Sequence, residues 1–142
     1  MPTRDAHARW ERSLQDGEGS LWTQSGTVKL PYSFESRFED GSGTNPEELI
    51  AAALAACYSM ALSNELSKAN HVPDSVETTA RAHLEKGDDG FSIPRIDLET
   101  SAAVRDIDDA QFQEIAQATA KACPVSKVLA GAQIELRAVL ES

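Results

Sequence analysis

The 142-residue sequence predicts an α+β fold, with an antiparallel sheet and a long buried central helix, in a single domain spanning residues 1–142. Three observations support this class. Segments that alternate polar and apolar side chains come before and after one long apolar helix, a second helical segment follows the later strands, and the chain closes on another alternating segment. Strands and helices that are segregated in this way are typical of a sheet with helices packed on it.

The first forty residues predict a meander of strands. "HARWERSL" (7–14) and "GSLWTQSGTVKL" (19–30) alternate polar and apolar residues, and "QDGEGS" (15–20) between them supplies turn residues. A third strand is expected over "PYSFESRFED" (31–40), which carries Arg37 and ends at the glycines that follow.

A helix is predicted next, from Pro46 to the vicinity of Lys68 and Asn70. Thr44 or Asn45 is the expected N-cap. Proline suits the first helical position, and the two glutamates after it suit the positive end of the helix dipole.

Hardly a polar atom occurs between Leu49 and Leu62 in this helix. A helix that is apolar all round has to be buried on all sides, and a small one-sheet domain covers only one face. The alanines at positions 51, 52, 55 and 56 would let two such helices approach closely. We therefore expect the uncovered face to pack on a second copy of the chain in a homodimer.

The rest of the chain predicts a hairpin, two helices and a strand. Residues 76–104 read as two long strands joined around "KGDDG", and residues 106–122 as an amphipathic helix with Ile107, Phe112, Ile115 and Ala118 on one face. Pro124 permits a break and a fresh helical start through "VSKVLAG", and "AQIELRAVL" (132–140) alternates as a final strand.

Composition limits the possible partners and compartments. The formal charge of -10 argues against nucleic-acid binding, which needs basic patches. The N-terminal segment does not resemble a secretory signal, and no apolar run reaches the ~18 residues that suggest a membrane span. We expect a cytoplasmic protein, in which two cysteines are more often catalytic or redox-active than bridged.

The two cysteines, Cys57 and Cys123, leave alternatives open. Cys57 lies in the apolar helix and could be a small core residue. Cys123 directly precedes Pro124, at the expected N-cap of a short helix, where free N–H groups would stabilise a thiolate. A metal site is not expected, because the histidines at positions 7, 71 and 83 are scattered and zinc needs four ligands. No cofactor is expected either.

The segment "PYSFESRFEDGSGTNPEELIAAALAACYSMALS", followed far downstream by "KACPVSKVL", resembles the OsmC subfamily of the osmotically inducible protein C and organic hydroperoxide resistance (OsmC/Ohr) family. The likeness extends to "HARWE", "SVETTARAHLEK", "GFSI" and the C-terminal strand. It implies an OsmC-like fold, an intertwined homodimer and a stress-response role as a thiol-dependent peroxidase. Such an enzyme reduces organic hydroperoxides, and hydrogen peroxide less well, without metal or haem.

The resemblance also implies roles for four residues. Cys57 would be the peroxidatic cysteine, Cys123 the resolving cysteine, Arg37 the residue that activates the thiolate, and Glu47 the carboxylate that orients Arg37. Glu48 is an ambiguous neighbour, and Glu47 is chosen because it directly follows the Asn-Pro pair. An external dithiol, such as a lipoylated protein, would reduce the resulting intramolecular disulfide.

Two tensions accompany these roles. Local electrostatics favours Cys123 as the more acidic thiol, whereas the resemblance assigns the attack to Cys57, which would need the cation of Arg37. Glu47 also precedes Cys57 by ten residues, a rise of ~15 Å along one helix. We therefore expect each active site to be built from both chains of the dimer.

Apolar residues are available to line a substrate pocket, which would favour alkyl or lipid hydroperoxides: Leu49, Ile50, Leu54, Tyr58, Met60 and Phe38. Leu54 and Met60 fit a core role better. A competing interpretation is a non-catalytic dimeric stress protein that binds a small apolar ligand, with cysteines that only pack. A further one is a structural domain stabilised by a disulfide.

Overall fold

The computed structural model describes residues 2–141, and in this range it contains two three-stranded sheets and four helices. The chain divides into two compact units, residues 1–49 and residues 50–142, and each is described by itself. Helix α2 (Pro46–Lys68) begins in the first unit and continues into the second.

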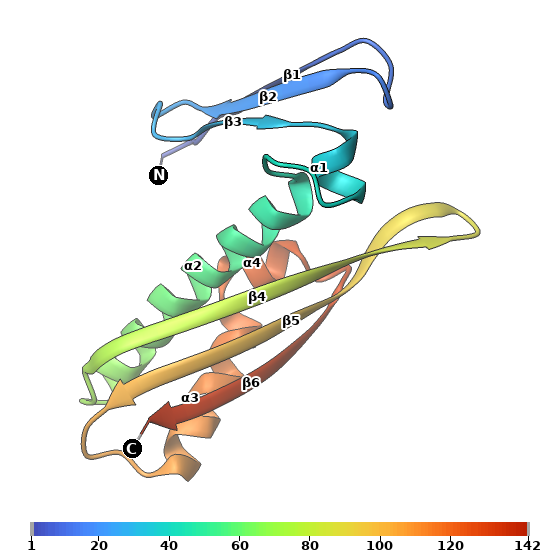
Figure 1. Ribbon diagram of the computed structural model, residues 1–142. Coiled ribbons are helices and arrows are strands. Elements are labelled where there is room, and N and C mark those ends of the chain that lie inside the picture. The colour runs from blue at the N-terminus through green and yellow to red at the C-terminus, as the bar shows by residue number, and fades with distance from the viewer. Residues whose placement is uncertain (1, 142) are drawn as a thin grey trace. The chain divides into compact units, whose positions relative to one another are not determined.

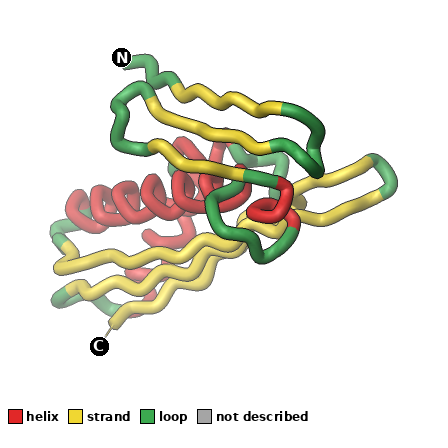
Figure 2. The backbone as a smooth tube through the Cα atoms, turned by 45° about the horizontal axis from the view of Figure 1, so that its top comes forward, coloured by secondary structure: helices red, strands yellow, loops and turns green. Residues whose placement is uncertain are grey.

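The first unit contains the predicted meander. Strands β1 (Ala6–Glu11), β2 (Glu18–Thr23) and β3 (Lys29–Tyr32) pair antiparallel in that order (Figure 2). Gly19 faces Trp10 on one side and Tyr32 on the other, and a Cβ there would lie 2.6 Å from the Trp10 ring and 2.7 Å from the Tyr32 ring. A glycine at this position therefore lets the two rings meet across the middle strand, with centroids 5.3 Å apart.

The prediction of a strand over residues 31–40 was wrong. Strand β3 ends at Tyr32, and a short helix, α1 (Phe34–Phe38), carries Arg37. The reason is a pair of serines: Ser36 N–H donates to Ser33 Oγ at 3.1 Å, and Ser33 N–H donates to Ser36 Oγ at 2.8 Å. This reciprocal capping box starts a helix where the aromatic alternation suggested a strand.

The second unit contains the predicted hairpin, formed by β4 (Pro73–Gly87) and β5 (Gly90–Val104). Strand β6 (Gln133–Glu141) pairs with β5 in parallel, so this sheet is mixed and the expectation of a wholly antiparallel sheet was wrong for its last strand. Helices α3 (Asp109–Ala122) and α4 (Pro124–Val128) carry the chain back along the sheet, which a parallel neighbour requires.

Helices α2 and α3 lie on the same face of the β4–β5–β6 sheet (Figure 1). Every fourth residue of α2 from Leu54 to Leu66 is fully buried in the core of this unit. On α3, Phe112, Ala116 and Thr119 are buried, whereas Ala118, which was expected on this face, is exposed. The core thus fixes the rotation of both helices about their axes.

Of the two expected N-cap residues, Asn45 caps the N-terminus of α2. Asn45 Oδ1 accepts a hydrogen bond from the N–H of Glu48 at 2.8 Å, and Pro46 is the first helical residue. The face opposite the buried one carries Ala52, Ala56 and Met60, and Met60 is 75% exposed. The second unit by itself therefore leaves an apolar face of this helix uncovered.

By length and composition alone, α2 could cross a membrane, since its most apolar window has a mean hydropathy of 1.4. The helix contains no unbroken apolar run of ~18 residues, because Ser59 interrupts the stretch from Leu49 to Leu62. The packing accounts for the apolar character in another way: one complete face of the helix lies in the protein core.

Candidate active site

The two cysteine side chains meet in the second unit. Cys57 lies in α2 and Cys123 at the junction of α3 and α4, and their Sγ atoms are 2.8 Å apart. Both are free thiols. A disulfide bond is ~2.05 Å long, so the sulfurs need to approach by less than about an ångström to form one.

Helix packing and two helix ends set this distance. Tyr58, next to Cys57, is fully buried and donates from its hydroxyl to the carbonyl of Ala116 at 3.1 Å, which ties α2 to α3. Cys123 closes α3 by donating its N–H to Thr119 O, and it opens α4 by accepting the N–H of Lys127. As expected from Pro124, Cys123 is therefore the N-cap of a short helix.

The two sulfurs differ in exposure and acidity. Cys57 is half-buried, whereas Cys123 is 1% exposed. Burial raises the pKa of Cys57, and its hydrogen bond with Cys123 adds to this effect. Burial also acts to raise the pKa of Cys123, but groups that would donate to its thiolate outweigh burial and lower that pKa: the Cys57 side chain, the N–H and hydroxyl of Ser126 and the N–H of Val125. Within this unit Cys123 is the more acidic thiol.

Arg37 and Glu47 form an ion pair in the first unit. Nη2 and Nε of Arg37 donate to the same oxygen, Glu47 Oε1, at 2.9 and 3.1 Å. Glu47 is buried, and its other oxygen has no hydrogen-bond partner within residues 2–141. Glu48 instead accepts the hydroxyl of Thr44 at 2.7 Å. The carboxylate that holds Arg37 is therefore Glu47.

A cavity of about 360 Å³ lies beside Arg37 in the first unit. Four of its eight lining residues are aromatic, and Arg37 Cζ is 5.1 Å from the centre of the Phe38 ring. The lining residues are Trp10, Arg12, Leu14, Tyr32, Ser33, Phe34, Arg37 and Phe38.

Among these lining residues, the sequence indicated Phe38 as part of a pocket and Arg37 as a site residue. The others were missed because they come from two strands, a short helix and the loop residues next to them. Two residues that the sequence indicated, Leu54 and Tyr58, are fully buried in the core of the second unit. The pairing of Trp10 with Tyr32 across Gly19 is the signal that could have located this pocket.

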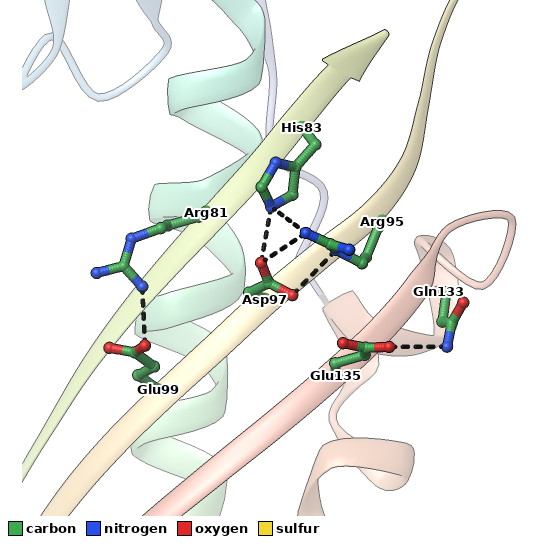
Figure 3. A network of polar contacts seen from close by, with 7 residues as sticks. All are labelled: Arg81, His83, Arg95, Asp97, Glu99, Gln133 and Glu135. Atoms are coloured by element: carbon green, nitrogen blue, oxygen red, sulfur yellow. Dashed lines mark hydrogen bonds and ion pairs between the residues drawn. The ribbon is translucent and has the colours of Figure 1, made fainter.

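The four predicted site residues thus form two pairs, one in each unit. The thiols could undergo a two-electron oxidation to a disulfide, and the guanidinium could stabilise an anion. Among residues 2–141, no three His, Cys, Asp or Glu side chains gather as metal ligands. His83 lies on β4, where its Nε2 is 2.7 Å from Asp97 and Arg95 is close to both (Figure 3).

Comparison with known proteins gives a consistent result. A family model described as OsmC-like protein matches residues 39–137. A relative from Escherichia coli K12, named peroxiredoxin OsmC, is 47% identical over 127 residues that cover 89% of each chain. A second, organic hydroperoxide resistance protein OhrB of Bacillus subtilis, is 34% identical over 115 residues, covering 80% of this chain and 82% of the relative.

Solved structures share the fold. The crystal structure of OhrB from Bacillus subtilis matches with a TM-score of 0.68 and 25% identity, covering 96% of this chain and 98% of that one. An OsmC-like protein from Mycoplasma pneumoniae matches with a TM-score of 0.76 over 99% of both chains, at 16% identity. The sequence and structural matches agree, and the chain belongs to the OsmC-like protein family.

Proposed function

We propose that the protein is a cysteine-based peroxidase with peroxiredoxin-like activity, which reduces organic hydroperoxides and, less well, hydrogen peroxide. The observation that carries this proposal is the pair of free thiols with sulfurs 2.8 Å apart. Relatives named as a peroxiredoxin and as an organic hydroperoxide resistance protein support a peroxidase-type role.

In the proposed reaction the Cys57 thiolate attacks one oxygen of the hydroperoxide. The O–O bond breaks, the alkoxide leaves and takes up a proton to become an alcohol, and Cys57 becomes a sulfenic acid. The Cys123 thiolate then attacks that sulfur, which forms the disulfide and expels hydroxide, and the hydroxide takes up a proton to become water. The exposure difference supports this assignment, because an external peroxide has access to half-buried Cys57 and not to Cys123.

Arg37 would supply the cation that the Cys57 thiolate needs. Two of its donors are held by Glu47, and Nη1 forms no hydrogen bond to the described residues, so it is available to a thiolate or peroxide oxygen. A guanidinium can serve both partners because it presents its donors in a planar fork. Its charge would lower the pKa of Cys57 and reverse the order of acidity that the second unit has alone.

We assign the site to the interface of a homodimer, with the Arg37–Glu47 pair of one chain beside the thiols of the other. The uncovered apolar face of α2 supports a homodimer. Ten helical residues separate Glu47 from Cys57, which corresponds to ~15 Å along the axis. A second chain would remove that separation, and in the assembled protein the two units would act as one OsmC-like domain over residues 1–142.

The aromatic cavity beside Arg37 fits the substrate class. A cavity of about 360 Å³ is of the size that ligand sites have, and its ring walls favour an alkyl or aryl group over a small polar peroxide. The cycle would need no metal or other cofactor and would be completed by an external dithiol, either a small molecule or a lipoylated protein. We place this activity in the cytoplasm, as the composition predicts.

The chemistry is tested by treating the reduced protein with one equivalent of cumene hydroperoxide and mapping its peptides by mass spectrometry. We expect a Cys57–Cys123 disulfide in the wild type and a trapped sulfenic acid on Cys57 in the Cys123→Ser variant. Two free thiols after this treatment would favour a non-catalytic ligand-binding protein. Full single-turnover activity of Cys57→Ser would refute the assignment of the attacking thiol.

The two-chain site is tested by complementation. Arg37→Ala and Cys57→Ser are each expected to be inactive as homodimers. In a mixed dimer of the two, a site built from both chains restores one intact site, whereas a site within one chain leaves both defective. Activity that does not return on mixing, with heterodimers present by native mass spectrometry, would contradict the interface site.

A further inference from the structure

Ser126 lies in the first turn of α4, three residues after the helix N-cap, Cys123. Both residues are buried, Ser126 with 5% and Cys123 with 1% of its surface exposed. No side-chain hydrogen bond of Cys123 caps the helix, but a thiolate at this position would have the N–H groups of Val125 and Ser126 as donors, and both lower the pKa of Cys123.

The hydroxyl of Ser126 has an unusual environment. Its Oγ is buried and forms no hydrogen bond within the usual limits to any described residue. A buried hydroxyl without a partner is destabilising, and such a group calls for a physical explanation. The reaction can supply a partner, because a thiolate at Cys123 is a far better acceptor than the thiol. The side chain and the N–H of Ser126 both favour the thiolate of Cys123.

Few other groups influence this sulfur. From α2, Cys57 contacts it directly, and Tyr58 lies near it with a hydroxyl engaged by the carbonyl of Ala116. Burial, and secondarily the charge of Cys123, raise the pKa of Tyr58, so this side chain remains neutral. Lys127 on α4 is exposed. Ser126 is therefore the hydroxyl-bearing side chain best placed to respond to charge on Cys123.

We propose that the Ser126 hydroxyl stabilises the Cys123 thiolate and thereby makes Cys123 the leaving group when an external dithiol reduces the Cys57–Cys123 disulfide. This inference rests on the proposed function in one respect, that the disulfide is the product of peroxide reduction. It adds that the reductant attacks Cys57 and that Ser126 controls this choice.

Reduction of the disulfide takes two exchange steps. A thiolate of the reductant bonds to Cys57 Sγ, the bond between Cys57 and Cys123 breaks, and its electron pair stays on Cys123 Sγ. The second thiolate of the reductant then attacks its own sulfur in the mixed disulfide and releases Cys57 as a thiolate. The reductant leaves as a cyclic disulfide, oxidised by two electrons, and the two cysteines are reduced by the same two.

Two features favour this direction over the reverse. A sulfur with a lower pKa leaves faster in thiol–disulfide exchange, and the donor groups near Cys123 lower its pKa whereas burial raises that of Cys57. The reverse attack would also have to reach Cys123, which is 1% exposed, instead of half-buried Cys57.

The first test identifies the attacked sulfur in the wild type. The disulfide is formed with diamide and treated briefly with excess glutathione. The products are then blocked with N-ethylmaleimide and digested with trypsin, which separates the two cysteines. We expect glutathione on Cys57 and N-ethylmaleimide on Cys123 in about tenfold excess over the opposite pattern. Equal labelling, glutathione mainly on Cys123, or no disulfide with diamide would overturn the proposal.

The second test addresses Ser126. In a Cys57→Ser background, thiolate absorbance at 240 nm should show that Ser126→Ala raises the pKa of Cys123 by roughly one pH unit, the scale of one charge-assisted hydrogen bond. With both cysteines present, the same change should slow reduction of the diamide-formed disulfide by dithiothreitol by about two- to tenfold. Ser126→Thr keeps the hydroxyl and should retain both values.

Thr119→Val is a matched control, because it removes another buried hydroxyl of the same region that already donates to Ile115 O at 2.7 Å. It should leave the pKa of Cys123 unchanged. Unchanged values in Ser126→Ala, or equal changes in Thr119→Val, would refute the role of Ser126. Since diamide makes the disulfide, these outcomes do not depend on peroxide turnover, whose absence would count against the proposed function alone.

Discussion

Oxidation of the thiol pair should raise the thermal stability of the protein substantially. Cys57 and Cys123 are 66 positions apart in the chain, yet their sulfurs lie 2.8 Å apart in the folded state. A bond between them would restrict the conformations of the unfolded chain and would require little movement in the folded state. The gain therefore comes mainly from the unfolded state.

The magnitude follows from the loop length. Closing a loop of 66 residues corresponds to about 4 kcal/mol in the chain-entropy model, and native disulfides typically contribute about 2–4 kcal/mol. For a chain of 142 residues the unfolding entropy near the midpoint is about 0.3 kcal/mol per kelvin. The oxidised protein should accordingly melt about 7–14 °C above the reduced protein.

Differential scanning calorimetry of reduced and hydroperoxide-treated protein measures this shift at one protein concentration. Cys123→Ser is the matched control, because peroxide can oxidise its Cys57 but cannot close the loop. A wild-type shift below about 2 °C, with the disulfide complete by mass spectrometry, would refute the entropic reasoning. An equal shift in Cys123→Ser would assign the effect to oxidation of Cys57 alone.

Three further predictions concern other contacts. Arg37→Lys should lower the rate of peroxide reduction at least about tenfold, because an ammonium cannot hold Glu47 and also present a planar fork of donors. Closure of the disulfide by diamide should stay unchanged, and stopped-flow kinetics measures both rates. Tyr58→Phe removes the hydrogen bond to Ala116 and should cost about 1 kcal/mol, or about 3 °C by calorimetry. His83, which hydrogen-bonds to Asp97, is the main cause that lowers the pKa of that carboxyl. Asp97 therefore contributes stability that is present above its unfolded pKa of ~3.9 and lost as the pH falls through the lower folded value, so Asp97→Asn should flatten the acid limb of a urea-midpoint profile.

Each of these has an outcome that contradicts it. An Arg37→Lys variant with wild-type peroxide kinetics would show that the reaction does not need the planar donors of a guanidinium. An unchanged thermal midpoint in Tyr58→Phe would mean that the hydrogen bond of the hydroxyl adds nothing to the free energy of unfolding. For Asp97, Glu99→Gln is the control, since it removes the neighbouring carboxylate that pairs with Arg81 (Figure 3). Equal flattening by both changes would rule out a specific role of His83.

Local chemistry made much of the fold predictable. Asn45 and Pro46 mark the start of α2, and the "KGDDG" turn fixes the β4–β5 hairpin. In each case a short stretch of sequence contains both the signal and the contact that satisfies it. The same holds for Cys123, whose place before Pro124 makes it the N-cap of α4.

Features that depend on distant partners were not predictable from pattern. Strand β6 alternates as any edge strand would, and its parallel pairing with β5 depends on how the α3–α4 connection returns along the sheet. Helix α1 was missed because its capping box uses Ser36, where glutamate or glutamine is the usual signal. The approach of Cys57 to Cys123 has no local signature, and only the family resemblance implied it.

The division of the site residues into two pairs implies a division of labour in the proposed cycle. Within the second unit the lower pKa belongs to Cys123, which suits a thiol that resolves a sulfenic acid and later leaves as a thiolate. Peroxide attack needs the opposite order, so it should depend on the Arg37–Glu47 pair. Arg37→Lys and Ser126→Ala should therefore act on different steps: the first on disulfide formation by peroxide, the second on disulfide reduction. Because the steps follow one another, the double variant should show both single-step defects unchanged in size. A larger defect in either step than its own single variant shows would indicate that the two pairs are energetically coupled.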